Sequence, residues 1–215
     1  MKVKICGITN LQDAVSAMLV GADYIGFLVE VRSAKDRIKR EEAKEIIAKL
    51  PPEVKPVYVT TEKKAKKIIE IARDVKPALI QLHGDIPITE IQKIRKALKK
   101  TELIKSITIK NLHALDIAKE YEPSVDYLLL DSSKDKVRQK GEVHDWEISR
   151  HIVAASKKPV FLAGGLTPKN VSDAIGRVKP FGVDVNSGVE TRSRQKNHQL
   201  MKLFIQNVHS WRKKA

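Results

Sequence analysis

Eight short apolar runs alternate with amphipathic segments along the chain, and this alternation restricts the fold more than any other feature. The runs are rich in valine, isoleucine and leucine, which is typical of strands buried on both faces. Apolar residues at helical spacing between the runs predict a helix after each strand. The predicted strands cover residues 3–6, 24–29, 55–59, 78–83, 102–109, 125–131, 159–164 and 181–185.

Strict alternation of strands and helices predicts an α/β fold in which helices cover a parallel sheet. An open doubly wound sheet and a closed (β/α)8 TIM barrel both fit this pattern. The count of eight favours the barrel, and no G-x-G-x-x-G sequence follows the first strand, where a dinucleotide-binding fold would carry it. No linker-like segment divides the chain, so we predict a single barrel domain over residues 1–215.

The chain is strongly basic, with 41 Lys and Arg residues against 26 Asp and Glu and a formal charge of +15. A nucleic-acid surface would explain this charge. However, the lysines of residues 62–76 and 91–102 alternate with apolar residues at helical spacing, which indicates the solvent-facing sides of helices. We therefore expect no nucleic-acid partner, and the positive field would instead attract a small anionic substrate.

The single cysteine of the chain excludes an intramolecular disulfide. No apolar stretch is long enough to span a bilayer, and the N-terminal residues lack the apolar core of a signal peptide. We therefore expect a cytoplasmic protein with no membrane partner. A monomer and a homodimer are both compatible with the sequence.

Active sites of TIM barrels lie on the loops that follow the strands. These loops carry Cys6, His83 and Asp131. Cys6 is either a small buried apolar residue or a reactive thiol. Asp131 ends an apolar run, where a carboxylate suits the barrel mouth, could cap a helix or could form a turn. His83 is as compatible with a hydrogen bond to its own loop as with a substrate contact.

Lys4 and Asp184 are charged residues inside predicted strands. Alternation places Lys4 on the same side of the first strand as Cys6, where its charge could favour a thiolate. Asp184 lies between two valines and is predicted to point into the barrel. Since a buried carboxylate needs a partner, Asp184 is either a hydrogen-bonding group for substrate or half of an internal ion pair, for which Lys4 is a candidate.

Glycine-containing segments follow the last two predicted strands, in the sequences FLAGGLTPKNV and FGVDVNSGVE. Glycines let main-chain N–H groups approach an anion, and a helix that starts near Thr167 or Pro168 would add its positive end. In TIM barrels these two loops commonly bind phosphate, although the glycines could also serve tight turns alone. The predicted phosphate-binding residues are Gly164, Gly165, Asn186, Ser187 and Gly188.

Six motifs, in order from about residue 3 to residue 190, resemble the phosphoribosylanthranilate isomerase family: KICGIT, GADYIGF, IQLHGD, LLLD, AGGLTPKNV and VDVNSGVE. The resemblance implies a TIM barrel of tryptophan biosynthesis that needs no cofactor or metal. The implied reaction is an Amadori rearrangement of N-(5'-phosphoribosyl)anthranilate to 1-(2-carboxyphenylamino)-1-deoxyribulose 5-phosphate.

The same resemblance implies roles for individual residues. Asp131 would be the general acid that protonates the furanose ring oxygen, and Cys6 would be the general base that removes the proton from C2. His83 and Asp184 would line the site of the phosphosugar substrate.

Three segments depart from the family pattern. The loop RSAKDRIKREEA (32–43) is one residue longer than usual, so that either Lys35 or Arg37 could contact the anthranilate carboxylate. The segment RQKGEVHDW (138–146) lacks two of the usual glycines, and Asn186 replaces a usual serine. These departures keep open a divergent phosphosugar isomerase, or a phosphosugar-binding paralogue, with a different aglycone preference.

Overall fold

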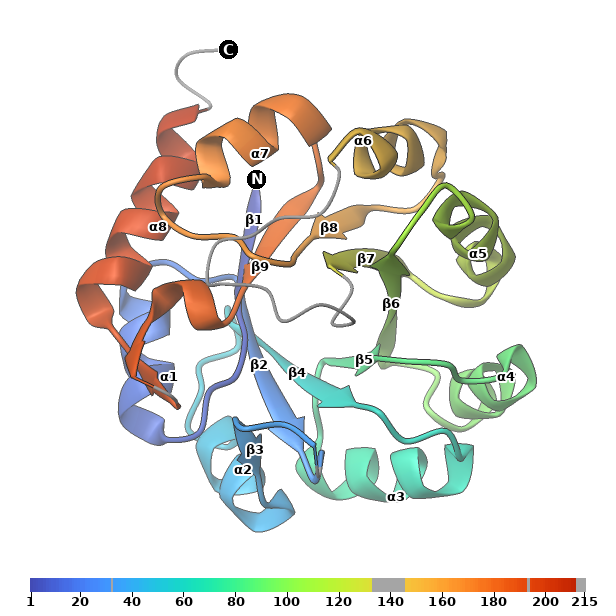
Figure 1. The fold of residues 1–215 in the computed structure, drawn as a ribbon. Helices are drawn as coiled ribbons and strands as arrows, with labels where there is room; N and C mark the ends of the chain where they lie inside the picture. Colours follow the sequence, from blue (N-terminus) through green and yellow to red (C-terminus); the bar gives the residue numbers. More distant parts are fainter. Residues whose placement is uncertain (32, 133–145, 193, 212–215) are drawn as a thin grey trace.

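A closed ring of parallel strands forms the centre of the molecule, and helices pack around its outside (Figure 1). The computed structural model describes residues 1–31, 33–132, 146–192 and 194–211. The ring closes because the first strand pairs with both the second and the last. Its eight strands are β1 (Lys2–Ile5), β2 (Tyr24–Val29), β4 (Lys55–Thr60), β5 (Leu79–Leu82), β6 (Glu102–Ile109), β7 (Tyr127–Ser132), β8 (Val160–Leu162) and β9 (Gly182–Val185).

A helix follows each barrel strand in the described part of the chain, so the fold is the predicted (β/α)8 TIM barrel in one domain. None of these helices combines the length and the apolar character that a membrane span needs. The helices are α1 (Leu11–Leu19), α2 (Arg40–Ile47), α3 (Ala65–Val75), α4 (Ile88–Ala97), α5 (Ala114–Tyr121), α6 (Trp146–Ala155), α7 (Val171–Val178) and α8 (His198–Trp211).

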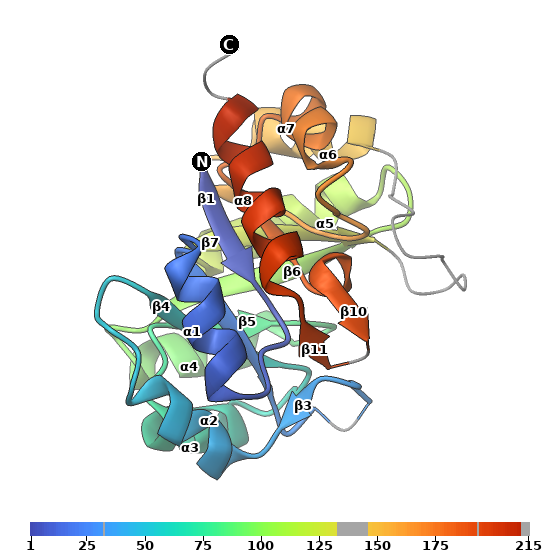
Figure 2. The same cartoon turned by 90° about the vertical axis from the view of Figure 1, so that its left-hand side faces the viewer.

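Short elements that the sequence pattern did not predict lie at one end of the barrel. The strand β3 (Arg37–Ile38) extends the edge of β2, and β10 (Glu190–Arg192) pairs antiparallel with β11 (Gln195–Lys196). Figure 2 shows β3 and the β10–β11 hairpin on the same side of the barrel. Strands of two or three residues are too short to carry a periodic signal, which explains why they were missed. Two short 3₁₀ helices, η1 (Glu122–Ser124) and η2 (Ser187–Val189), complete the elements.

The strands separate two apolar cores, one between barrel and helices and one inside the barrel. Successive side chains of a strand point to opposite faces, so Val3 and Ile5 join the outer core while Lys4 and Cys6 point inward, as predicted. At the amino ends of the strands, aromatic rings fill the barrel. The ring centroids of Tyr24 and Phe161 lie 5.4 Å apart there in an edge-to-face arrangement. The space for a ligand therefore lies at the carboxyl ends of the strands.

Candidate active site

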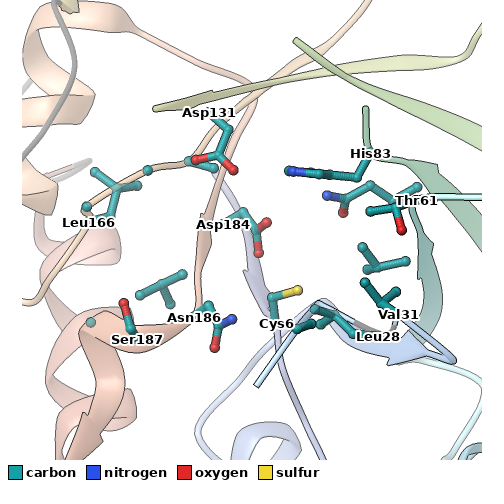
Figure 3. Close-up of a pocket in the computed structure, with 18 of the residues that line it drawn as sticks. Cys6, Leu28, Val31, Thr61, His83, Asp131, Leu166, Asp184, Asn186 and Ser187 are labelled. Atoms are coloured by element: carbon teal, nitrogen blue, oxygen red, sulfur yellow. The ribbon is translucent and has the colours of Figure 1, made fainter. Parts of the chain in front are cut away.

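A cavity of about 240 Å³ lies at the carboxyl ends of the barrel strands. Cys6, His83, Asp131 and Asp184 line it together with both predicted glycine turns. Figure 3 shows these side chains around a common space, in which Asp184 lies between Cys6 and Asp131. The structure thus brings together residues as far apart in the chain as Cys6 and Gly188.

Cys6 follows the last residue of β1 and remains in register with the neighbouring strand, since its N–H donates to the carbonyl of Val185 at 2.8 Å. Gly26 on β2 makes room for the thiol, because a Cβ at that position would lie 2.8 Å from Sγ. Gly7 then turns the chain with a left-handed φ of +73°. Cys6 is buried, with 7% of the residue exposed, and it belongs to the inner apolar core while also lining the cavity.

Lys4 and Asp184 form an internal ion pair, which is one of the two roles predicted for Asp184. Lys4 Nζ donates to Asp184 Oδ2 at 2.9 Å, and the lysine side chain is completely buried. The second carboxylate oxygen, Oδ1, is buried and has no hydrogen-bond partner among the described residues. Because Asp184 also lines the cavity, this oxygen is available to a donor on a bound molecule.

The pKa of Cys6 is set by two opposing effects. Burial raises the pKa of the thiol above its usual value, and the nearby Lys4 ammonium group lowers it by a smaller amount. The Asp184 carboxylate raises the Cys6 pKa further. The predicted influence of Lys4 is therefore correct in direction, but burial outweighs it and the pKa lies above the ordinary range.

The glycine turns have the geometry that main-chain anion binding requires. Gly164 and Gly165 have left-handed φ angles of +84° and +67°. A Cβ at Gly188 would lie 1.9 Å from the carbonyl oxygen of Leu166, so only glycine lets the two turns approach each other. Among the described residues, no acceptor takes the N–H groups of Gly164 or Gly165. These N–H groups can therefore bind an anion such as phosphate.

The helix expected to start near Thr167 or Pro168 begins later, at Val171. The side chain of Asn170 explains the difference, because its Oδ1 accepts from the N–H of Thr167 at 2.8 Å and its Nδ2 donates to the carbonyl of Gly165 at 3.0 Å. These two bonds hold residues 165–170 in a turn directly after the Gly164–Gly165 pair.

Gln81 is a cavity residue that the sequence reasoning missed. Its side chain is only 3% exposed, Nε2 donates to Ser106 Oγ at 3.1 Å, and Oε1 has no partner among the described residues. The signal for it was present in the sequence, because Gln81 is a polar residue inside the apolar run 78–83 and alternates with His83. His83 itself lines the cavity, and its N–H donates to the carbonyl of Thr60 at 2.8 Å.

The two candidate contacts for a substrate carboxylate do not line the cavity. Lys35 Nζ lies 2.5 Å from Glu190 Oε2 and is held toward the β10–β11 hairpin, and Arg37 is an exposed residue of β3. A role for either in binding anthranilate stays a prediction. The segment with changed glycines, including Gly141 and Asp145, lies outside the described residues, whereas Trp146 is the buried first residue of α6.

Within the described ranges, no group of three or more His, Cys, Asp or Glu side chains could hold a metal ion. The groups that line the cavity include the Cys6 thiol, the carboxylates of Asp131 and Asp184, the His83 imidazole and the main chain of the two glycine turns.

A TIM barrel with these groups in one cavity at its strand termini belongs to the class of barrel enzymes that transform small molecules by proton transfer. The family model of N-(5'phosphoribosyl)anthranilate (PRA) isomerase matches residues 3–207. The chain belongs to this family, whose members are aldose–ketose isomerases of tryptophan biosynthesis.

Relatives of known sequence and structure agree with this assignment. The N-(5'-phosphoribosyl)anthranilate isomerase of Methanocella arvoryzae is 38% identical over 207 residues, which are 96% of this chain and 97% of the relative. The crystal structure of the Thermotoga maritima phosphoribosyl anthranilate isomerase superposes with a TM-score of 0.89 at 36% identity, covering 98% and 99% of the two chains. Another solved isomerase, in complex with reduced 1-(o-carboxyphenylamino)-1-deoxyribulose 5-phosphate, has a TM-score of 0.85, 36% identity and the same coverage.

Proposed function

We propose that this pocket rearranges N-(5'-phosphoribosyl)anthranilate by general acid–base catalysis, with Asp131 as the acid and Cys6 as the base. The observation that supports the proposal best is the cavity shared by Cys6, Asp131 and both glycine turns (Figure 3). A substrate held by its phosphate at one end of such a cavity presents its sugar to both groups. Acid and base can then act in sequence on one bound molecule.

The first step opens the sugar ring. Asp131 donates a proton to the ring oxygen as the bond between that oxygen and C1 breaks, and the lone pair of the anilinic nitrogen forms a C1=N bond. In the second step the Cys6 thiolate removes the proton from C2, and the electron pair left behind forms a C1=C2 bond while the C1=N electrons return to nitrogen. The resulting enolamine tautomerises to the C2 ketone, so no oxidant or reductant is consumed.

Cys6 can act as the base only when it is ionised. Burial raises the pKa of Cys6, and Lys4 is the main cation that opposes this effect from inside the barrel. We expect turnover to increase as the pH rises above neutrality, because the fraction of thiolate increases. A rate that falls steadily over pH 7–9 would contradict Cys6 as the base.

The substrate phosphate is proposed to bind the main-chain N–H groups of residues 164–165 and 186–188. The positive φ angles of Gly164 and Gly165 and the close approach of Gly188 to Leu166 favour this position. Main-chain donors suit a doubly charged group here, because they need no side chain to be ordered on binding.

The aromatic ring is proposed to lie against the apolar wall of the cavity, which includes Leu28, Val31 and Val59. Two buried acceptors without partners among the described residues, Gln81 Oε1 and Asp184 Oδ1, would then receive donors from the sugar hydroxyls or the anilinic N–H. Each acceptor would gain the hydrogen bond that it lacks within the protein.

The proposal is tested by following the fluorescence of phosphoribosylanthranilate with purified protein. We expect the unaltered chain to convert it, and Cys6→Ala and Asp131→Asn each to reduce turnover by about 100-fold or more, the usual contribution of a general acid or base. Asp116→Asn, a substitution of an exposed aspartate on α5, is the matched control and should leave turnover unchanged. No conversion by the unaltered chain would refute the proposal.

A growth experiment separates the isomerase from a paralogue with another aglycone. Expression of the chain should restore growth of a tryptophan auxotroph that lacks this isomerase, and failure despite soluble expression would favour the paralogue. A relative from Thermotoga maritima is dimeric. For this chain, a cytoplasmic location stays a prediction. Whether it is a monomer or a homodimer also stays open, and sedimentation of the purified protein would measure its oligomeric state.

A further inference from the structure

Asn186 joins two charged residues from different parts of the chain. Its Oδ1 accepts from Lys196 Nζ at 2.6 Å, and its Nδ2 donates to Asp36 Oδ2 at 3.0 Å. Both partners are buried, since Asp36 is 1% exposed and the Lys196 side chain is completely covered. The amide therefore bridges a buried cation on β11 and a buried anion in the loop between β2 and β3.

Asp36 depends on this bridge. Its second oxygen, Oδ1, is buried and has no hydrogen-bond partner among the described residues, so Asn186 Nδ2 is the donor that compensates for the desolvation of the carboxylate. A buried carboxylate with such limited support is costly to keep. Its position calls for a role beyond stability.

Lys196 anchors the other end of the bridge. Its Nζ donates to the carbonyl of Asn186 at 3.1 Å and to Glu190 Oε1 at 2.7 Å, and Glu190 Oε2 in turn pairs with Lys35 at 2.5 Å. The Asn186 side chain therefore lies between the Lys196 cation and the Asp36 anion, and Glu190 holds Lys196 in place. This balance keeps the amide oriented, with its oxygen toward Lys196 and its nitrogen toward Asp36.

Asn186 also lines the cavity. Its Oδ1 would be 2.4 Å from a Cβ at Gly7, so its side chain packs against the turn that follows Cys6. Figure 3 shows Asn186 between Ser187 and Cys6. Ser33 and Ala34, which precede Asp36 in the same loop, line the same cavity. A displacement of the amide would thus move both the Cys6 turn and the wall formed by residues 33–34.

We propose that Asp36 and Asn186 are positioning residues for the isomerase reaction, whose hydrogen bond holds residues 33–36 against the phosphate-binding turn and sets the width of the pocket beside the aromatic part of the substrate. The inference rests on the proposed function of this pocket. Neither side chain exchanges protons with the substrate, and the main-chain N–H of Asn186 is left to the phosphate. Loss of the bond therefore weakens substrate binding more than it slows the chemical steps.

A charge-exchange experiment tests the pair. Asn186→Asp places a carboxylate beside Asp36, and the repulsion should raise KM for phosphoribosylanthranilate by about tenfold or more, with kcat within about threefold. Combining Asn186→Asp with Asp36→Asn restores a donor–acceptor pair in the reverse direction and keeps an acceptor for Lys196. KM of this double variant should return to within about threefold of the unaltered chain. Inhibition by inorganic phosphate reports the phosphate turn separately and should remain unchanged in the double variant.

Asp36→Asn alone preserves an acceptor for Asn186 and should raise KM by less than Asn186→Asp does. Asp116→Asn is the control for a carboxylate on the surface. Urea unfolding of each variant identifies any that do not fold, and the double variant keeps the test valid if Asn186→Asp fails to fold. Turnover by the unaltered chain without rescue in the double variant would overturn the inference alone. Absence of turnover in the unaltered chain would overturn the proposed function and the inference with it.

Discussion

The ammonium group of Lys4 lies 2.9 Å from the carboxylate of Asp184 inside the barrel, two residues before Cys6. This pair links the first and last strands, which are neighbours in register as Lys4 and Asp184. It closes the ring with a charge interaction and places a cation beneath the proposed base. The same pair therefore bears on both the stability of the barrel and the reactivity of the thiol.

Removal of one partner should be strongly destabilising. Lys4→Met leaves the Asp184 carboxylate without its cation, and we expect the free energy of unfolding to fall by about 3 kcal/mol, as is usual for a broken buried pair. The double variant Lys4→Met with Asp184→Leu removes both charges and should recover at least half of that loss. Urea unfolding followed by circular dichroism measures both. Equal stability of Lys4→Met and the unaltered chain would show that the pair contributes nothing.

The pH dependence of Cys6 alkylation should reflect its burial. Because burial raises the pKa of Cys6, the rate of reaction with iodoacetamide should reach half its maximum only above the ordinary thiol pKa. Lys4 lowers the Cys6 pKa, so Lys4→Met should move the midpoint to still higher pH. Mass spectrometry of the single cysteine gives the rate at each pH. A midpoint below pH 8 in the unaltered chain would contradict this account.

Two glycine-to-alanine substitutions should differ in effect: one should weaken substrate binding, and the other should stabilise the fold. Gly188→Ala forces a Cβ to within 1.9 Å of the Leu166 carbonyl, so the turn proposed to bind phosphate must shift and KM should rise by about tenfold or more. Gly176 lies inside α7, where the nearest atom to a Cβ is 3.4 Å away, and Gly176→Ala should stabilise the protein by up to about 1 kcal/mol. Steady-state kinetics and thermal unfolding of both variants test these expectations. An unchanged KM in Gly188→Ala would argue against binding of the substrate phosphate at this turn.

Lys105 should make the stability of the protein depend on pH. Burial lowers the pKa of Lys105 to about 8, while Nζ donates to the carbonyls of Gly84 at 2.9 Å and Ser106 at 2.6 Å. The unfolded chain keeps the lysine protonated up to pH 10.5, so between pH 8 and 10.5 it binds more protons than the folded state and the contribution of Lys105 to stability rises with pH.

The variant Lys105→Met isolates this effect. The free energy of unfolding of the unaltered chain, minus that of the variant, should increase by about 2 kcal/mol between pH 8 and pH 10. Urea unfolding at several pH values gives this difference, and it cancels the other titrating groups. A difference that stays constant with pH over this interval would show that the lysine remains charged in the fold.

The sequence by itself determined the architecture and most of the site. Hydrophobic periodicity is a local property of strands and helices, so the order of eight strand and helix units could be read without tertiary contacts. In a parallel barrel the ends of all strands meet at one edge, and this rule alone brought Cys6, His83, Asp131 and the glycine turns into one predicted site. The same alternation predicted that Lys4 and Asp184 point inward.

Only the tertiary structure decided how these groups interact. The hydrogen bond from Asn186 to Asp36 spans 150 positions in the chain, and no local pattern specifies such a contact. Whether the pKa of Cys6 is raised or lowered depends on the balance between desolvation and the charge of Lys4. That balance is known only once the burial of both groups is known. The ion pair between Lys35 and Glu190 likewise joins residues 155 positions apart, and no local pattern specifies it. Periodicity is local, whereas desolvation and pairing depend on distances between distant segments, and these exist only once the barrel has closed.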